Sequence, residues 1–207
     1  MRHLSKAEAL ALVAEEAAGL AERFAGCAMC GAIAAISEGA VRAGNEGVHQ
    51  ASEGLSTAGT TFSQAPGERS VEASIRRGVL AENEVAVAML DRFATRRGHV
   101  VVVLRRHAEA IAELPWEEYA AVQRLAWEAS RALTTALAPV RVYVAALGAT
   151  RRIATSFPHH HVHVIPLMDG GEIDRPASVL TWANGVHVYE AGEMAALSER
   201  LRDAWPR

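Results

Sequence analysis

Three histidines recur at every second position in the run His159-His160-His161-Val162-His163. Successive side chains of a β-strand point to opposite faces, so a strand here would place His159, His161 and His163 on one surface. A solvated face has little need of three titratable rings, which favours a chemical role. A neutral imidazole is both a nucleophile and a metal ligand, so the run predicts either covalent phosphoryl chemistry or a three-histidine metal site.

A second reactive group is the pair Cys27 and Cys30, which are the two cysteines of the chain and stand in Cys-Ala-Met-Cys. They are too close together to staple a distant loop. The N-terminus also lacks the basic patch, apolar run and small-residue cleavage site of a signal peptide. We therefore expect a cytoplasmic protein in which these thiols have a metal or redox role rather than a structural disulfide.

Length and composition fit one substantial folded domain. The chain has 207 residues, of which half are apolar, and a net charge of -3. This charge gives no reason to expect a long nucleic acid as partner, although it is compatible with a small anionic substrate. No stretch of about 18 or more apolar residues exists, so no membrane partner is expected.

Two features organise the N-terminal part of the chain. Ser5-Lys6-Ala7-Glu8 is a capping box, which predicts a helix over residues 5–24. The chain from Gly31 to about Arg69 is rich in Gly, Ala, Ser and Thr, and residues 52–61 follow neither the helix nor the strand period. We therefore expect a long insertion, about residues 31–75, of which part is mobile.

The remaining elements surround the histidine run. Gly98 marks a turn between two apolar strands, and Pro115 opens the longest helix, which has apolar residues at helical spacing. The strand after Pro139 should pair antiparallel with the histidine strand. The expected strands are 85–90, 100–104, 140–144, the histidine run to Pro166, and 186–189, and a last amphipathic helix should cover about residues 193–204.

With Val164-Ile165-Pro166 after it, the histidine run resembles the signature of the histidine-triad (HIT) superfamily. The likeness covers about residues 79–167, where Glu82–Asp91 and Gly98–His107 resemble the paired central strands of the family and Ser156-Phe157-Pro158 precedes the triad. It implies a single α+β HIT-like domain over residues 1–207, with an antiparallel five- to six-stranded sheet and packed helices. Residues 79–167 would form its core and residues 168–207 a C-terminal extension.

The resemblance also implies roles for individual residues. His161, the middle histidine, would attack the α-phosphorus of a nucleotide and form a nucleotidyl-histidine intermediate that water or another acceptor resolves. His163 would hydrogen-bond phosphate oxygens, Ser156 would contact the bridging atom of the leaving group, and Asp91 would contact the ribose hydroxyls. The implied activity is that of a nucleoside phosphoramidate or dinucleotide hydrolase, or a nucleotidyltransferase, in a protein whose relatives commonly form homodimers.

One departure from the family pattern concerns the strand at Val140. Ala145 and Ala146 stand near its end, where many relatives carry an asparagine. Contacts to phosphate or sugar are therefore in doubt there, and Arg151 and Arg152 in the next loop are an alternative source of positive charge.

A zinc site is also implied by the resemblance. A subset of the family, together with the related galactose-1-phosphate uridylyltransferases, binds zinc through CxxC, a histidine after the central strand and the first triad histidine. Here these are Cys27, Cys30, His107 and His159, a donor set that suits a closed structural site. About 76 residues lie between Cys30 and His107, so the insertion must loop out for the site to form.

Two other functions stay open at this point. A zinc-stabilised nucleotide-binding protein with little turnover would fit the missing asparagine and the insertion. A metallohydrolase would hold a catalytic metal on the three alternating histidines of the run. Outside these motifs, His3, His99 and His187 fit ordinary surface or strand positions.

Overall fold

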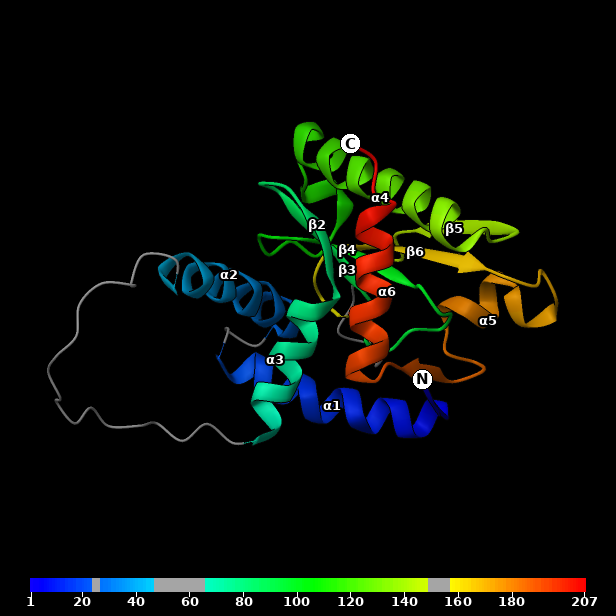
Figure 1. Cartoon of the computed structure of the whole chain (residues 1–207), viewed down its shortest axis with the longest axis horizontal. Helices are drawn as coiled ribbons and strands as arrows, with labels where there is room; N and C mark the ends of the chain where they lie inside the picture. The colour runs from blue at the N-terminus through cyan, green and yellow to red at the C-terminus, as the bar shows by residue number, and fades with distance from the viewer. Residues whose placement is uncertain (24–26, 47–65, 149–156) are drawn as a thin grey trace, which may run out of the picture.

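A five-stranded antiparallel sheet forms the centre of the protein, which we describe from a computed structural model (Figure 1). The structure describes residues 1–23, 27–46, 66–148 and 157–207. The strand order is β2-β3-β4-β6-β5. The strands are β2 Val79–Glu82, β3 Ala86–Leu90, β4 Val100–Leu104, β5 Arg141–Ala145 and β6 His161–Leu167. The predicted α+β fold with an antiparallel sheet is therefore confirmed.

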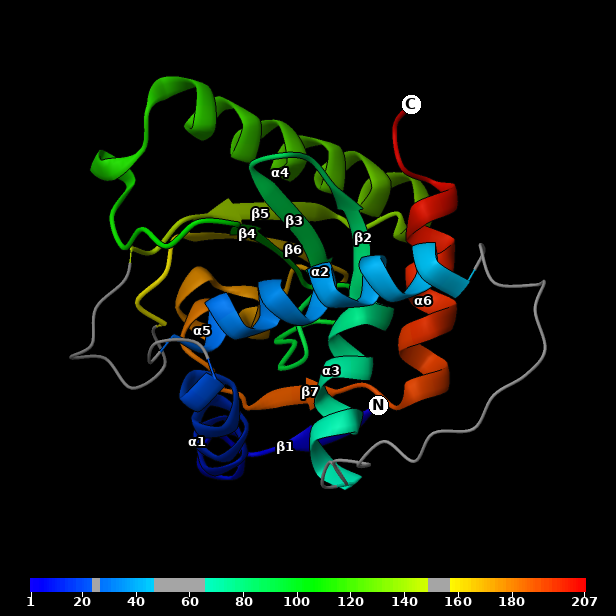
Figure 2. The same ribbon diagram turned by 90° about the vertical axis from the view of Figure 1, so that its left-hand side faces the viewer.

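Helices cover both faces of this sheet. The long helix α4, Trp116–Leu137, packs on one face together with the C-terminal helix α6, Ala191–Asp203. Helices α2, Ala28–Glu46, and α3, Pro66–Gly78, pack on the other face beside α1, Lys6–Arg23. Figure 2 shows α2 lying across the front of the strands. Shorter elements are β1 Arg2–Leu4, η1 Ile111–Glu113, η2 Glu172–Asp174, α5 Pro176–Leu180 and β7 Val186–Val188.

Strand alternation divides the apolar side chains between the two faces. Residues Val100, Val102 and Leu104 of β4 point toward α4, whereas Val101 and Val103 point toward α2 and α3. On β6, the partners of Val101 and Val103 are His163 and His161. Paired residues of an antiparallel sheet share a face, so these two histidines lie on the face covered by α2 and α3.

Most elements expected from periodicity are present. The strands at 85–90, 100–104 and 140–144 and the helix after Pro115 are confirmed, and β5 pairs antiparallel with β6 as predicted. The capping box is also confirmed, because the backbone N–H of Ser5 donates to Glu8 at 2.8 Å and the N–H of Glu8 donates to the Ser5 hydroxyl at 3.3 Å. The histidine strand begins at His161, so His159 precedes it.

The segment predicted as an insertion of about residues 31–75 differs from that expectation. Helix α2 occupies its first part and helix α3 its last part, and Ile33, Ile36 and Ile75 are buried against the sheet. Helix α2 differs from the expectation because Ala, Gly and Ser dilute its helical apolar pattern. Residues 47–65, which include His49 and the sequence without periodicity, lie outside the described residues.

The C-terminal extension, residues 168–207, contributes to two parts of the fold. Strand β7 pairs with β1 in a separate two-stranded sheet, and α6 adds Met194, Leu197 and Leu201 to the main core. None of the described helices is long and apolar enough to cross a membrane.

Candidate active site and metal centre

His161 opens strand β6 with its ring held in one orientation. Its Nδ1 lies 2.7 Å from the carbonyl oxygen of His159. A carbonyl oxygen can only accept a hydrogen bond, so Nδ1–H is the donor and the lone pair of the neutral ring is on Nε2. His161 is partly exposed. It therefore presents a fixed nucleophilic nitrogen at the start of the strand.

His163 and His99 form a hydrogen-bonded pair beside it. The Nε2 of His99 lies 3.0 Å from Nδ1 of His163, and the backbone N–H of Thr95 donates to His99 Nδ1 at 3.4 Å. Since a backbone N–H can only donate, His99 carries its proton on Nε2 and donates it to His163. His163 then carries its own proton on Nε2, and the rings of His161 and His163 lie 4.8 Å apart.

Burial keeps this pair neutral. It lowers the pKa of His99 to about 3, with a further contribution from repulsion by His161. The pKa of His163 is also lowered to about 3, by burial first and by repulsion from His99 and His161 next. At neutral pH, His163 is thus a hydrogen-bond donor through Nε2 and carries no charge.

Asp91 follows strand β3 and lies next to this pair. Its Oδ2 is 3.4 Å from His99 Nδ1, and its side chain is 18% exposed. Burial raises the pKa of the Asp91 carboxyl, partly offset by attraction to His163 and by the hydrogen bond from the Phe93 N–H. The structure therefore brings Asp91, His163 and His161 together, and His99 joins them.

The structure describes the strand position that departs from the family pattern but not the loop that follows it. Ser156, Arg151 and Arg152 lie outside the described residues, so their roles stay predictions. Ala145 pairs with His163 in the β5–β6 register. The position opposite His163 therefore offers a methyl group, and no polar side chain, to a ligand.

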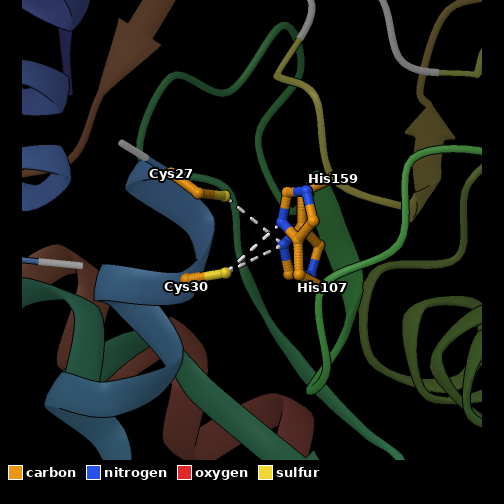
Figure 3. A group of neighbouring side chains, drawn as sticks. All are labelled: Cys27, Cys30, His107 and His159. Atoms are coloured by element: carbon orange, nitrogen blue, oxygen red, sulfur yellow. Dashed lines mark hydrogen bonds between the residues drawn. The ribbon is translucent and has the colours of Figure 1, made fainter. Parts of the chain in front are cut away.

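The four predicted metal ligands converge in a cluster that Figure 3 shows. Cys27 immediately precedes α2 and Cys30 lies in its first turn, while His107 follows β4 and His159 precedes β6. Their ligand atoms all lie within 4.8 Å of one another. Nδ1 of His159 is 3.5 Å from each cysteine Sγ, and Nδ1 of His107 is 3.5 Å from Sγ of Cys30.

The surroundings of the cluster fit a zinc ion. Nε2 of His159 donates to the Leu104 carbonyl at 2.6 Å, which leaves the Nδ1 lone pair facing the sulfurs, as is usual for histidine ligands. Burial and the neighbouring Cys27 raise the pKa of the Cys30 thiol to about 11, so a cation is needed before both sulfurs become thiolates. Two thiolates and two imidazoles are a donor set that tetrahedral zinc prefers.

A metal on the three triad histidines has no such support. Among the described residues, two groups bring metal-ligand atoms within 4.8 Å, and neither joins His159, His161 and His163. The second group is Asp91, His99 and His163, where the His99 ring turns a different nitrogen toward each neighbour. That ring lies between the other two residues, with Nδ1 3.4 Å from Asp91 and Nε2 3.0 Å from His163, so the three groups do not converge on one point.

Comparison with known proteins identifies the family. The family described as HIT domain matches residues 72–170. A 16.1 kDa HIT-like protein of Mycoplasma pneumoniae is 33% identical over 102 residues, which are 49% of this chain and 69% of the relative. The chain belongs to the HIT family. A HIT-like protein of Mycoplasma genitalium is 32% identical over 103 residues, covering 49% of this chain and 72% of that protein.

The solved structures of the HIT family agree with this fold. A histidine triad protein from Sinorhizobium meliloti superposes with a TM-score of 0.50 and 16% identity, covering 63% of this chain and 92% of that one. The HIT match contains the triad, Asp91, His99 and His107, whereas Cys27 and Cys30 precede it. The metal centre therefore joins the HIT segment to the helices that come before it.

His99 is the site residue that sequence reasoning missed. The backbone N–H of Asp91 donates to the His99 carbonyl at 2.8 Å, so the two residues face each other across the β3–β4 hairpin. Pairing the two predicted strands through the turn at Gly98 would have placed His99 beside Asp91. The signal was thus in the register of the hairpin and not in a motif.

Proposed function

We propose that this HIT protein is a nucleotide hydrolase or nucleotidyltransferase that acts at the α-phosphate of a nucleoside phosphoramidate or dinucleotide. The observation that carries the proposal is the His161 ring, whose Nδ1–H is held by the His159 carbonyl at 2.7 Å. The lone pair of the neutral ring is therefore on Nε2, which is the nitrogen left free to attack phosphorus as a covalent catalyst.

The chemistry proceeds in two displacements. Nε2 of His161 attacks the phosphorus, a P–N bond forms, and the bond from phosphorus to the leaving group breaks with its electron pair on the leaving group. Nε2–H of His163 donates to a phosphate oxygen, while Ser156 contacts the bridging atom of the leaving group. Asp91 binds the ribose hydroxyls. Water or another acceptor then displaces His161 and restores the free imidazole.

We further propose that Cys27, Cys30, His107 and His159 hold a structural zinc ion. Zinc, when bound, cross-links the start of α2 to the segments that follow β4 and precede β6. The carbonyl of His159 is the group that orients the nucleophile, so fixing His159 also fixes the direction of the His161 lone pair.

The protein also has a surface suited to a homodimer. Strand β5 ends the sheet order, and within the described part of the chain its one strand neighbour is β6. Val144 of this strand is 49% exposed, and Trp127 of α4 is 54% exposed. An edge strand with exposed apolar side chains can pair with the same strand of a second copy. This supports the homodimer that the family resemblance implies.

A second candidate is a nucleotide-binding protein with little turnover. The pairing of Ala145 with His163 favours it, because no polar side chain stands opposite the histidine that contacts phosphate. This protein would bind nucleotides with the same residues yet release them unchanged.

Intact-protein mass spectrometry after mixing with a nucleoside phosphoramidate and an acid-free quench separates these functions. We expect an adduct of one nucleotidyl group on wild type and on His3→Ala, a control at an exposed histidine of β1, but none on His161→Ala. An adduct that persists in His161→Ala would contradict the proposed nucleophile. Binding without an adduct or turnover would establish the second candidate.

A further inference from the structure

The loop that joins β3 to β4 carries Asp91 at one end and His99 at the other. Backbone hydrogen bonds link its parts, because the N–H of Asp91 donates to the His99 carbonyl at 2.8 Å and the N–H of His99 donates to the Arg96 carbonyl at 2.9 Å. The N–H of Thr95 also donates to Nδ1 of the His99 ring at 3.4 Å. The position of His99 therefore depends on how residues 92–98 are held.

The C-terminal extension holds the middle of this loop. The Arg96 guanidinium donates to the Asp174 carboxylate at 2.6 Å and also to the Ile173 carbonyl. Asp174 is buried, and its other oxygen accepts from the N–H of Gly170 at 2.9 Å. A buried charge pair with these partners is held in one geometry, so the Arg96 carbonyl that accepts from His99 is fixed to the extension.

The segment from β7 to Tyr189 holds the loop at two further points. The N–H of Ala94 donates to the His187 carbonyl at 3.0 Å, and the N–H of His187 donates to the Ala94 carbonyl at 2.7 Å. The Tyr189 hydroxyl accepts from the buried N–H of Gly98 at 2.7 Å. The extension therefore bonds to the loop on both sides of Arg96, and one of these bonds is at the residue that precedes His99.

These contacts come from outside the segment that matches the HIT family. The match covers residues 72–170, so it contains the loop but neither Asp174 nor Tyr189. Phe93 of the loop also packs against Trp182 of the extension, with ring centroids 6.0 Å apart. The loop that ends at His99 is thus supported by a part of the chain beyond the family match.

We propose that Tyr189 and Asp174 are positioning residues for the histidines of the active site. Each acts on His99, which in turn donates to His163 at 3.0 Å. The inference rests on the proposed function in so far as the rate of nucleotidyl transfer reports it. The hydrogen bond between the two histidines exists without a substrate, so a spectroscopic measurement tests the same inference when no nucleotide turns over.

Tyr189→Phe is the most selective test, because it removes one hydroxyl and keeps the packing of the ring. The N–H of Gly98 then loses its acceptor, and the turn before His99 is no longer fixed. We expect kcat and kcat/KM for a nucleoside phosphoramidate to fall together, about 10- to 100-fold, with little change in KM. Asp174→Asn, which keeps the shape of the side chain, should lower kcat about tenfold through Arg96.

Nitrogen NMR of the histidine rings in the purified full chain needs no nucleotide. In wild type we expect His99 and His163 each in one tautomer, with the proton on Nε2. Tyr189→Phe and Asp174→Asn should move these ring signals toward the average of the two tautomers. Tyr189→Phe should also speed hydrogen exchange at the Gly98 amide.

Two variants in the same extension are matched controls. Val179→Ala truncates a buried side chain that packs on Ile165 and Leu167, so it should lower the Tm without changing kcat or the ring signals. Arg175→Gln breaks an exposed ion pair with Glu172 and should leave the Tm, kcat and the ring signals unchanged.

Arg96 allows a conservative comparison. Arg96→Lys keeps a positive charge beside Asp174, whereas Arg96→Gln removes it. Arg96→Lys should therefore retain at least about fivefold more of the wild-type kcat than Arg96→Gln. Equal losses in these two variants would show that the charge pair does not position the loop.

Other outcomes would also overturn the inference. Unchanged kcat and ring signals in Tyr189→Phe and Asp174→Asn would do so, and either variant suffices if the other fails to fold. An equal loss of kcat in Tyr189→Phe and Val179→Ala would mean that the extension acts through stability alone. If wild type shows no turnover but the ring signals move in these two variants and not in the controls, the proposed catalysis is wrong and the positioning role stands.

Discussion

Replacing His99 with phenylalanine should weaken catalysis while keeping the packing of the site. His99 is 2% exposed and donates from Nε2 to His163 at 3.0 Å. Phenylalanine offers a ring of similar size without a nitrogen, so Nδ1 of His163 loses its donor and the ring is no longer held in one tautomer. A buried polar atom left unpaired costs about 1–3 kcal/mol, which corresponds to a fall in kcat/KM of about 5- to 150-fold.

The same change should alter the pH dependence. The pKa of His163 is lowered to about 3 by burial, by repulsion from His99 and by repulsion from His161. Removing His99 removes one of these repulsions and a hydrogen bond that favours neutral His163, so the pKa should rise toward its ordinary value of about 6.5. The acid limb of the kcat/KM profile should therefore move to higher pH.

His99→Gln is the comparison that separates positioning from folding. A glutamine amide can place an N–H near the former Nε2, so this variant should keep more activity than His99→Phe and a profile closer to wild type. Steady-state kinetics on a nucleoside phosphoramidate, with thermal melts to confirm folding, would measure both. Equal kcat/KM in the two variants with an unmoved acid limb would refute the assigned hydrogen-bond direction.

Four further outcomes are expected. As pH drops from about 6.5 toward 3, His99 should lower the free energy of unfolding by about 1.4 kcal/mol per pH unit. The reason is that the folded ring, with its pKa lowered to about 3, stays neutral while the unfolded ring takes a proton. Urea titrations of wild type and His99→Phe at several pH values would measure this difference in pH dependence. Cys27→Ser should reduce the bound zinc to less than one ion per chain, as measured by metal analysis, and should lower the Tm measured by calorimetry. Gly98→Ala should lower the free energy of unfolding, measured by urea titration, by about 1–3 kcal/mol. Gly98 has φ +90, and an added Cβ would lie 2.7 Å from Leu137 Cδ1. Val144→Asp should shift the mass by light scattering to that of a monomer, with an unchanged circular dichroism spectrum.

The central strands and the long helix could be predicted because their patterns are local. Val100–Leu104 is a continuous β-branched and apolar run, and all five of its residues are buried, as a strand covered on both faces requires. Helix α4 carries its buried residues at helical spacing, and Pro115 immediately precedes it. In both elements, the residues that decide the structure are neighbours in the sequence.

Helix α2 could not be predicted in the same way. Helix α2 is rich in Ala and Gly, so its apolar face, with Ile33 and Ile36, is short and its pattern weak. What stabilises it is packing on Val87 and Val103 of the sheet, which lie far along the chain. Tertiary contacts of this kind decide the helix, and they cannot be read from a local window.

The role of His159 shows the same limit within the site. The alternating run predicted that His159 would share a face with His161 and His163, yet β6 begins at His161. His159 is fully buried, and its ring meets the ring of His107 at 5.3 Å and the two cysteines. The strand alternation therefore holds for His161 and His163 but not for His159. The partners of His159 were predicted by the resemblance to a zinc-binding subset of the family.

Helix α2 explains how two distant segments can form one site. Cys30 stands 77 positions before His107, and the two meet because α2 starts at the edge of the triad and then runs across the face of the sheet. Ala28 and Met29, which lie between the cysteines, line an apolar pocket that Asp91 also lines. One helical turn thus contributes to both the metal centre and this pocket, so a shift of that turn must move the metal ligands and the pocket wall together.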